Sequence, residues 1–381
     1  MYKVLIIRQT YDSHIIRFIK NLKEYNPKAE IDFVCQTTSD PPAELCYNVK
    51  SIYRIESAHN KIALFRVVLN FISIRRFFRN LSSKEHYNVI NIHFPSYEYS
   101  FATSFLKKCA DFLVLTPWGS DVYRISKIKK LILKHLFNKA DYICGIGNRF
   151  DKDVRKMFCV PSDKIVYLSM GSDTIDFFID NIYNINTDGA KKVLGVDNSY
   201  VITCGYNGSK GQNHSQIIQA IIKSRNQLPE NLVLFFPFTY AGTQKYRIQL
   251  ETMLKSNNIH FKFFTEFLSL KDLLILRMAT DIFIHVQVSD ANSSSLKEYI
   301  LCDKKVINGA WMQYDDLNEY TTKPYFELDC LNDLEDFIVN VFRAPRIQIN
   351  EMTKNNIKKL GYKYWTPRWD AFFRKCSTII N

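Results

Sequence analysis

Short apolar runs alternate along the first half of the chain with longer segments whose apolar residues recur every three or four positions. Such runs, bounded by polar residues, are typical of buried strands, and the longer periodic segments are typical of helices. Strands are expected at Lys3–Ile7, Ile31–Cys35, Val89–His93, Phe112–Thr116, Tyr142–Gly145 and Lys164–Tyr167, with helices between them. This alternation predicts an α/β fold with a parallel, doubly wound sheet.

The same alternation restarts in the second half, after a segment without a clear period. Asp176–Asp188 is expected to be a linker, and strands follow at Tyr200–Cys204, Leu232–Phe236, Ile259–Phe264, Ile282–Val288 and Lys305–Ile307. We therefore expect one Rossmann-like domain over residues 1–180 and a second over 190–360, facing each other across a cleft. Residues 361–381 are aromatic and basic, and a helix beginning near Pro367 is expected to pack back on the first domain.

Positive charge is concentrated in the first half. The 381 residues hold 51 Lys and Arg against 38 Asp and Glu, a net charge of +13. Up to residue 185 the counts are 27 and 18, and beyond it 24 and 20, so the halves carry +9 and +4. A basic half suits an anionic partner such as lipid head groups, a lipid-linked phosphate or nucleic acid. An ordinary basic surface is the alternative.

One segment of this half, Lys61–Leu81, combines a helical apolar stripe with Arg75, Arg76 and Arg79. It predicts a helix that lies on an anionic membrane or, equally, a packed helix with a solvated arginine face. No apolar run reaches the ~20 residues that a membrane span needs. The nine cysteines include no C-x-x-C pair and most lie in apolar runs, as in a reducing compartment. The expected location is cytoplasmic, peripheral on the inner face of the membrane.

The most informative segment runs from the strand at Ile282 to the helix that follows it. Asp290 lies in the turn after the strand, Ser293, Ser294 and Ser295 open the helix, and Glu298 lies in its first turns. A strand that leads through a loop of small polar residues into a helix is where open α/β sheets bind anionic ligands. Two structural alternatives stay open. Ser295-x-x-Glu298 is a capping-box pattern, and Asp290 can be an ordinary turn residue.

A glycine-rich loop follows the first strand of the second half. Gly205, Asn207 and Gly208 permit close approach of the backbone to phosphate, and Lys210 supplies a positive charge. The loop is neither a P-loop nor the dinucleotide fingerprint. By itself it is equally compatible with a simple turn.

In the first half, Trp118, Gly119 and Asp121 follow the strand that ends at Thr116. In a doubly wound sheet Asp121 would point into the crevice at the strand ends, or it would cap the next helix. His14 occupies the corresponding position after the first strand. Alternatively, His14 has only a structural role.

These segments, in this order, resemble a GT-B glycosyltransferase of family four. The family's E-x7-E signature is matched in spacing by Asp290-x7-Glu298, and Gly171-Ser172-Asp173 is similar to its turn at the end of the first domain. The sequence departs from the family at Trp118, where a His is usual, and at Tyr206, where an Arg is usual. Gly205–His214 and Pro237–Tyr246 are also similar to 4-acetamidofucosyltransferase, a GT-B enzyme that inverts configuration.

The resemblance implies a hexosyltransferase that moves a sugar from a UDP-, GDP- or dTDP-linked donor to a hydroxyl. The acceptor would be a growing, lipid-linked bacterial surface polysaccharide such as capsule or O-antigen. Retention is favoured over inversion, and neither a metal nor a cofactor is expected. The resemblance implies three groups of site residues. They are Asp290, Asp121 and Glu298 for catalysis; Gly205, Asn207, Gly208, Lys210, Tyr240, Ser293, Ser294, Ser295 and Glu298 for the donor; and His14, Trp118 and Gly119 for the acceptor side.

Two other classes are weaker matches. A nucleotide-sugar epimerase would need a G-x-x-G-x-x-G loop after the first strand of the chain and a separate Y-x-x-x-K pair. Gly205–Gly211 and Tyr206-x-x-x-Lys210 match these spacings, but the loop follows a strand of the second half and the two patterns overlap. A nucleic-acid-binding protein would fit the net charge, but the chain contains no recognised binding motif and its tyrosines are scattered. The expected partners are therefore a nucleotide-sugar, a lipid-linked or oligosaccharide acceptor and an anionic membrane surface, and not nucleic acid.

Overall fold

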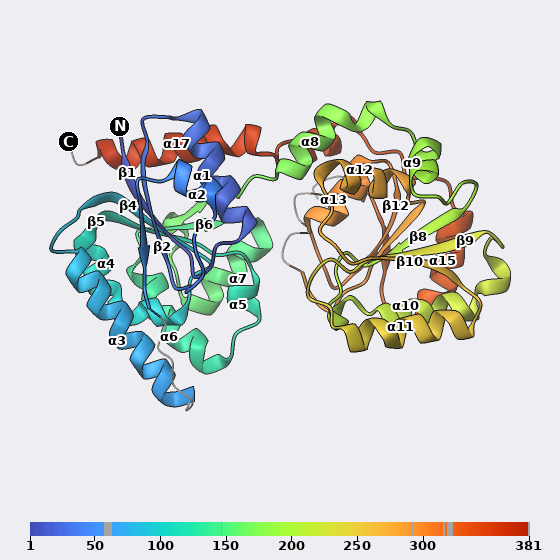
Figure 1. The fold of residues 1–381 in the computed structure, drawn as a ribbon, viewed down its shortest axis with the longest axis horizontal. Coiled ribbons are helices and arrows are strands. Elements are labelled where there is room, and N and C mark those ends of the chain that lie inside the picture. Colours follow the sequence, from blue (N-terminus) through green and yellow to red (C-terminus); the bar gives the residue numbers. More distant parts are fainter. Residues whose placement is uncertain (57–62, 146, 291–292, 315–316, 318–322, 380–381) are drawn as a thin grey trace. The chain divides into compact units, whose positions relative to one another are not determined.

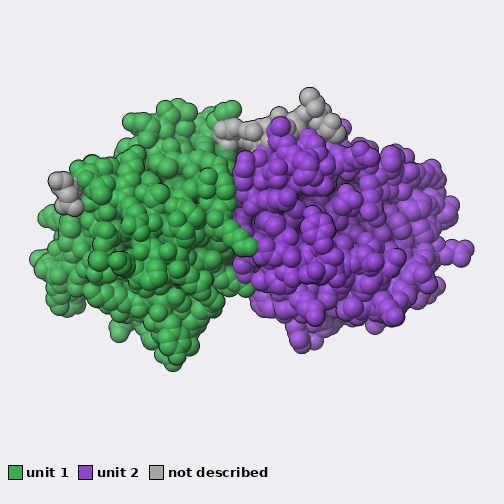
Figure 2. All heavy atoms as spheres, turned by 90° about the horizontal axis from the view of Figure 1, so that it is seen from above, with its two compact units in different colours: residues 1–171, 362–381 green, residues 172–361 purple. Residues whose placement is uncertain are grey.

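The chain forms two compact units. The computed structural model describes residues 1–56, 63–145, 147–290, 293–314, 317 and 323–379. Unit 1 contains Met1–Gly171 and Tyr362–Asn381, and unit 2 contains Ser172–Gly361; Figure 2 colours them separately. The C-terminal segment therefore returns to the first unit.

Unit 1 is built on a seven-stranded sheet in the order β3-β2-β1-β4-β5-β6-β7, and every neighbouring pair is parallel. The strand order reverses between β1 and β4, which is where ligands bind in open α/β sheets. The strands are β1 (Lys3–Ile7), β2 (Glu30–Cys35), β3 (Ser51–Arg54), β4 (Tyr87–His93), β5 (Ala110–Thr116), β6 (Tyr142–Gly145) and β7 (Ile165–Tyr167).

Helices cover both faces of this sheet (Figure 1), and each face has its own apolar core. One face packs against α3, α4, α6 and α7, and the other against α1, α2 and α17. The helices are α1 (Ser13–Tyr25), α2 (Ala43–Asn48), α3 (Ala63–Leu81), η1 (Tyr97–Ala102), α4 (Thr103–Cys109), α5 (Ser120–Tyr123), α6 (Lys127–Lys139), α7 (Asn148–Phe158), η2 (Ser162–Lys164) and α17 (Tyr362–Thr378).

The C-terminal helix α17 lies along α1 in Figure 1. It begins at Tyr362, so the prediction that it begins near Pro367 is wrong, and Pro367 lies inside it. Proline removes a backbone donor and usually breaks a helix. Here Trp365, Trp369 and Phe373, spaced four residues apart, are buried together in the core. Their burial outweighs the lost hydrogen bond.

Polar contacts also hold α17 to unit 1. The Asp370 carboxylate is buried and accepts hydrogen bonds from the Tyr2 hydroxyl (3.0 Å) and the Asn26 side-chain amide (2.7 Å). The Trp369 indole N–H donates to the carbonyl of Ser169 at 3.0 Å. The last helix of the chain is thus an integral part of the first unit.

Unit 2 repeats the same plan. Its six strands are all parallel and run in the order β10-β9-β8-β11-β12-β13, so its order reverses between β8 and β11. The strands are β8 (Tyr200–Cys204), β9 (Leu232–Pro237), β10 (His260–Phe264), β11 (Ile282–His285), β12 (Lys305–Gly309) and β13 (Phe326–Leu328). The position of each strand in the order matches a strand of unit 1, with β8 matching β1 and β11 matching β4.

The helices of unit 2 also lie on both faces of its sheet. One core packs against α10, α11 and α15, and two smaller cores against α8, α9, α12, α13 and α16. The helices are α8 (Asp173–Asn181), η3 (Ile182–Asn184), α9 (Thr187–Val193), η4 (Lys210–Gln212), α10 (His214–Lys223), η5 (Arg225–Gln227), α11 (Gln244–Ser256), α12 (Leu270–Ala279), α13 (Ser294–Leu301), η6 (Leu331–Asp333), α15 (Leu334–Arg343) and α16 (Glu351–Lys358).

The structure corrects two expectations and adds two strands. The segment Asp176–Asp188, expected as a linker, is largely helical, because Ile175 and Phe178 of α8 are buried in a core of unit 2. Strand β11 ends at His285, so residues 286–288, which were expected in the strand, belong to the loop that follows it. The edge strands β3 and β13 were not predicted because they are short and only partly buried, and so lack a continuous apolar run.

No helix in the described part of the chain is both long enough and apolar enough to cross a membrane.

Candidate functional site

The helix α13 begins differently from the predicted capping box. Ser293 is the N-cap, and its hydroxyl accepts a hydrogen bond from the Leu296 amide at 3.2 Å. Leu296 therefore occupies the third helical position, and Glu298 lies two residues too far along to reach the cap. The capping-box alternative for Ser295 and Glu298 is wrong, and Glu298 is bound elsewhere.

Glu298 forms a buried ion pair with Arg277 of α12. The Arg277 guanidinium donates from Nε (3.0 Å) and Nη2 (2.9 Å) to Glu298 Oε2, and both side chains are almost fully buried. Arg277 also donates to the Tyr299 hydroxyl at 3.0 Å and to Ser295 Oγ at 3.4 Å. Burial lowers the pKa of Arg277, but Tyr299 and Glu298 outweigh it and raise the pKa above its ordinary value. Arg277 thus fixes the orientation of Glu298.

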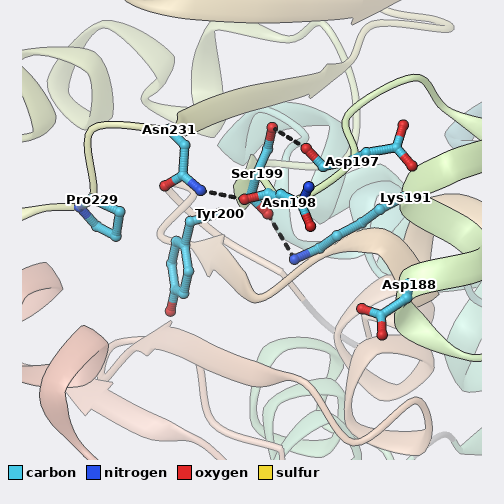
Figure 3. Close-up of a pocket in the computed structure, with 8 residues that line it drawn as sticks. All are labelled: Asp188, Lys191, Asp197, Asn198, Ser199, Tyr200, Pro229 and Asn231. Atoms are coloured by element: carbon cyan, nitrogen blue, oxygen red, sulfur yellow. Dashed lines mark hydrogen bonds between the residues drawn. The ribbon is translucent and has the colours of Figure 1, made fainter.

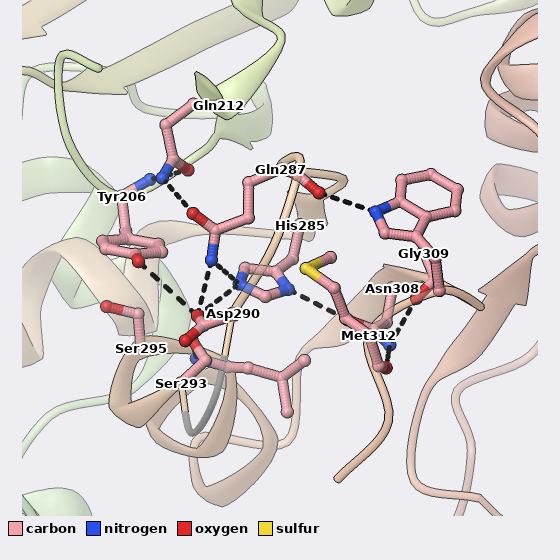
Figure 4. Close-up of polar contacts among 12 residues, drawn as sticks. Tyr206, Gln212, His285, Gln287, Asp290, Ser293, Ser295, Asn308, Gly309 and Met312 are labelled. Atoms are coloured by element: carbon pink, nitrogen blue, oxygen red, sulfur yellow. Dashed lines mark hydrogen bonds and ion pairs between the residues drawn. The ribbon is translucent and has the colours of Figure 1, made fainter. Parts of the chain in front are cut away.

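Asp290 lies in a polar network at the carboxyl end of β11 (Figure 4). Its Oδ2 accepts from the side-chain amide of Gln287 at 2.5 Å and from the Tyr206 hydroxyl at 3.5 Å. The same oxygen lies 3.6 Å from Nε2 of His285. Ser293 and Ser295 lie beside this network (Figure 4), so the structure brings the predicted serines and Asp290 together.

The orientation of the buried His285 ring follows from Asn308. The Asn308 amide nitrogen donates to the carbonyls of Gly309 (3.1 Å) and Met312 (2.9 Å), which leaves its Oδ1 facing the ring. His285 Nδ1 lies 2.9 Å from that oxygen and therefore carries a proton that it donates to Asn308. Its Nε2 faces the Gln287 amide (3.4 Å) and Asp290.

Gln287 connects this network to the glycine loop. Its Oε1 accepts from Gln212 at 2.6 Å, and its backbone carbonyl accepts from the Trp311 indole at 2.7 Å. Gln212 Oε1 in turn accepts from the Tyr206 amide at 3.2 Å. Gly205 has φ +64°, and a Cβ there would lie 2.8 Å from Gln212 Oε1. The glycine is therefore needed for this contact.

Most backbone amide groups of the glycine loop are already hydrogen-bonded. Amide groups of Gly205, Tyr206, Gly208, Ser209, Gly211 and Gln212 donate to partners within unit 2. Gly208 donates to the carbonyl of Tyr240 at 2.9 Å, which joins the two loops in which donor contacts are predicted. The Asn207 side chain accepts from the Ser209 amide and shapes the turn. Lys210 is exposed, with its ammonium 5.5 Å from the centre of the Tyr246 ring. Because these amide groups already donate within unit 2, Lys210 and not the loop backbone supplies the main positive charge at this loop.

In unit 1, Asp121 holds the turn that precedes α5. Its buried carboxylate accepts from the amides of Trp118 (3.0 Å) and Gly119 (2.8 Å), and Gly119 has φ 106°. Burial raises the pKa of Asp121 to about 7, although the backbone hydrogen bonds and Arg8 oppose the rise. The helix cap is Gly119 and not Asp121. The carboxylate stabilises the turn, and a role in transfer stays a prediction.

Aromatic and cationic residues surround Trp118. Its ring lies edge-on to His14 at 5.8 Å, so these two predicted acceptor-side residues are neighbours. The Arg8 guanidinium lies 4.4 Å from the centres of both the Trp118 and Phe94 rings and donates to Asp12 at 2.6 Å. Arg8 follows β1 directly, at the switch point of this sheet.

The sequence analysis did not identify several polar residues that lie at the candidate sites of the two units. In unit 2 they are His285, Gln287 and Gln212, and in unit 1 Arg8 and His93. The available signal was a polar residue at the end of an apolar strand, as in Ile282-Phe283-Ile284-His285. Arg277 gave no local signal, because its partner Glu298 lies on another helix.

A separate pocket of about 290 Å³ lies at the amino ends of β8 and β9 in unit 2 (Figure 3). Lys191 lies there, and its ammonium donates to the Ser199 carbonyl at 2.8 Å and to Asp281 at 2.7 Å. Asp281 also accepts from the amide of Val201, so these contacts hold the start of β8. The pocket contains none of the predicted site residues.

Comparison with known proteins supports the predicted class. Residues 3–146 match the family model described as glycosyl transferase 4-like. A glycosyltransferase from Rickettsia africae has a similar structure, with 13% identity, a TM-score of 0.70 and 99% of each chain covered. Anabaena HepE in complex with UDP and glucose shares 14% identity over 98% of each chain, with a TM-score of 0.64. Sucrose-phosphate synthase from Thermosynechococcus elongatus has a TM-score of 0.71 at 12% identity, covering 98% of this chain and 99% of its own.

No curated protein sequence matches the chain. The predicted α/β fold of GT-B type is confirmed by the two parallel sheets and by these structures. The predicted resemblance to a GT-B glycosyltransferase of family four is supported by the family match over residues 3–146 of the first unit and by the similarity of fold.

Proposed function

We propose that this protein transfers a sugar from a nucleotide-sugar to a hydroxyl of a lipid-linked, growing surface polysaccharide. The observation that carries the proposal is the position of Asp290. It lies just beyond β11 at the switch point of unit 2, where Gln287, Tyr206 and His285 hold it beside the first turn of α13. Ligands of open α/β sheets bind at that place.

The donor would be held by groups of three kinds. Glu298, oriented by Arg277, would accept hydrogen bonds from ribose hydroxyls. Lys210 and the first amides of α13, at Ser294 and Ser295, would offset the charge of the diphosphate, which grows as the sugar leaves. Asp290 would address the transferring sugar. Lys210 is exposed and so accessible to such a ligand.

The acceptor would bind in unit 1. Unit 1, with the bounds that the structure gives it, holds 31 Lys and Arg against 16 Asp and Glu, a net charge of +15. Unit 2 holds 20 against 22, a net charge of −2. An anionic, lipid-linked acceptor suits the first unit, where the neighbouring Trp118 and His14 would offer aromatic rings to a sugar and Gly119 forms the turn beside Trp118.

The choice of donor is guided by a similar structure. HepE is in complex with UDP and glucose, so UDP and UDP-glucose are the first ligands to test on this protein. The resemblance to family four favours retention of the anomeric configuration. Proton NMR of the first product would distinguish retention from inversion.

Titration calorimetry with UDP, GDP, CMP and dTDP tests the proposal, with a polynucleotide at physiological salt as the comparison. One nucleotide should bind, and at 100 times its Kd it should raise the free energy of unfolding by about 2.7 kcal/mol. Lys210→Gln should weaken that binding. Lys245→Gln, in the first turn of α11, is the matched control and should leave it unchanged. Binding of the polynucleotide in place of every nucleotide would contradict the proposal.

A further inference from the structure

The helix α3 of unit 1 presents one continuous outward face. Phe65, Val68, Leu69, Ile72, Arg75, Arg76 and Arg79 are exposed, and their spacing of three and four residues puts them on one side of the helix. The opposite side, with Ile74, Phe78 and Leu81, is buried in the core of the unit. The exposed apolar residues are therefore not the stripe that packs the helix.

This outward face has two halves. Its first two turns are apolar, and its last two turns carry the three arginines. Ile72 is 56% exposed although it lies in the middle of a helix of 19 residues. Apolar side chains exposed in a row on a helix, beside a row of arginines, are typical of a surface that binds at a membrane interface.

The helix α6 adds a second stripe of the same kind. Ile128 and Leu131 are 74% and 72% exposed, three residues apart, and Lys127, Lys129, Lys130 and Lys134 lie around them. A cavity of about 440 Å³ is lined by Arg75 of α3, Phe101 of η1 and Leu131 of α6, so the two helices border one hollow surface. Phe101 is itself exposed.

We propose that these two helices form a membrane-docking surface. We call it the α3–α6 surface and define its apolar part as Phe65, Val68, Leu69, Ile72, Ile128 and Leu131. These side chains would insert among the acyl chains of an anionic bilayer, while Arg76, Arg79 and the α6 lysines bind lipid phosphates. The inference goes beyond the proposed function, since it concerns neither donor nor acceptor.

Charge complementarity selects this occupant over a second copy of the chain. A two-fold dimer would place the same surface against itself. The arginines of α3 and the lysines of α6 would then face their own copies, and unit 1 carries +15 in all. An anionic lipid surface instead neutralises these charges.

Sedimentation with vesicles tests the surface, using phosphatidylglycerol mixed with phosphatidylcholine, and phosphatidylcholine alone. The protein should bind the anionic vesicles. Ile72→Gln with Leu131→Gln should lower the partition coefficient by roughly tenfold at both low and high salt, because inserted apolar area is not screened. Arg76→Gln with Arg79→Gln should lower it by roughly tenfold or more at low salt and much less at high salt.

Ile248→Gln with Met352→Gln is the matched control. These residues lie on helices of unit 2 and are 50% and 58% exposed, so the control removes a similar but somewhat smaller exposed apolar surface elsewhere. The control should bind vesicles as the unchanged protein does, and thermal unfolding should show that all variants are folded. Equal vesicle binding by control and Ile72→Gln/Leu131→Gln would overturn the proposal. The proposal would also be overturned if sedimentation equilibrium showed a dimer that Ile72→Gln/Leu131→Gln dissociates and the control variant does not. The α3–α6 surface would then bind a second copy of the chain.

Discussion

The carboxyl ends of β4 and β11 occupy the same place in the two units, and each strand ends on a histidine that is completely buried. His93 of β4 lies among Phe18, Trp118 and Trp369. Its Nε2 lies 3.0 Å from the Asn91 amide nitrogen, and its buried Nδ1 has no hydrogen-bond partner among the residues that the structure describes. His285 of β11 has polar partners on both nitrogens.

The charges near the two histidines differ in sign. Burial, and then the nearby Arg8, lowers the pKa of His93 to about 3. His285 instead faces the carboxylate of Asp290. The residue after the first strand differs too, because β1 is followed by Arg8 and β8 by Gly205. One strand order thus supports a cationic, aromatic edge in unit 1 and an acidic, hydrogen-bonded edge in unit 2. The topology fixes where a site forms, and the residues just beyond the strands decide its chemistry.

The largest expected effect concerns the buried charges of unit 2. Glu298→Gln leaves the Arg277 guanidinium buried without its counter-ion, and should lower the free energy of unfolding by about 3–5 kcal/mol. Asp12→Asn is the counterpart in unit 1. It removes the charge paired with the less buried Arg8 but can still cap α1, so about 1 kcal/mol is expected. Urea unfolding measures both.

The double replacement Arg277→Met with Glu298→Leu controls the first of these variants. It removes both charges and should recover most of the stability lost by Glu298→Gln. If the double variant is as unstable as the single one, packing and not the buried charge explains the loss.

The second prediction compares the two carboxylates at the strand ends. Asp290→Asn keeps an acceptor for Gln287 but removes the charge, so turnover should fall roughly 100-fold or more while the affinity for the free nucleotide stays nearly constant. Asp121→Asn keeps an acceptor for the turn and should lower turnover much less. Initial rates and calorimetry on both variants decide this. An equal loss of nucleotide affinity with Asp290→Asn would place Asp290 at the nucleotide instead.

The smallest net effect is expected in the pH dependence of stability, because two buried groups act in opposite senses. Because the pKa of folded His93 is lowered, the unfolded chain binds the proton first, and stability is lost as the pH falls from about 6.5 toward 3, by up to about 1.4 kcal/mol per pH unit. The raised pKa of Asp121 acts in the opposite sense, so its stability cost appears as the pH rises from about 4 to 7.

Single variants separate these two contributions in urea unfolding between pH 4.5 and 7.5. His93→Gln should make the free energy of unfolding rise less steeply with pH, and Asp121→Asn should make it rise more steeply. An unchanged slope in His93→Gln would mean that the His93 ring can be charged in the folded protein. Its buried surroundings would then not keep it neutral.

Much of the fold could be predicted because each element has a local cause. Apolar runs and helical periodicity located the central strands and their helices, including α13, which begins within the predicted run of serines. The short edge strands β3 and β13 gave too weak a pattern, and Pro367 suggested a helix start that burial of Trp365 and Trp369 overrides. Asp290 could be selected because it follows a strand and precedes a helix, which is a local pattern.

The sequence by itself therefore determined the class of fold, the places where the strands end and the candidate acids near those ends. The tertiary structure decided the partners. Periodicity cannot show that Glu298 pairs with Arg277, that Asn308 orients His285, or that residues 362–378 return to unit 1. It also shows that α3 has apolar residues but not that Phe65, Val68, Leu69 and Ile72 are left exposed. The reason is physical, since a pattern states which side of an element is apolar, whereas only packing determines what covers that side.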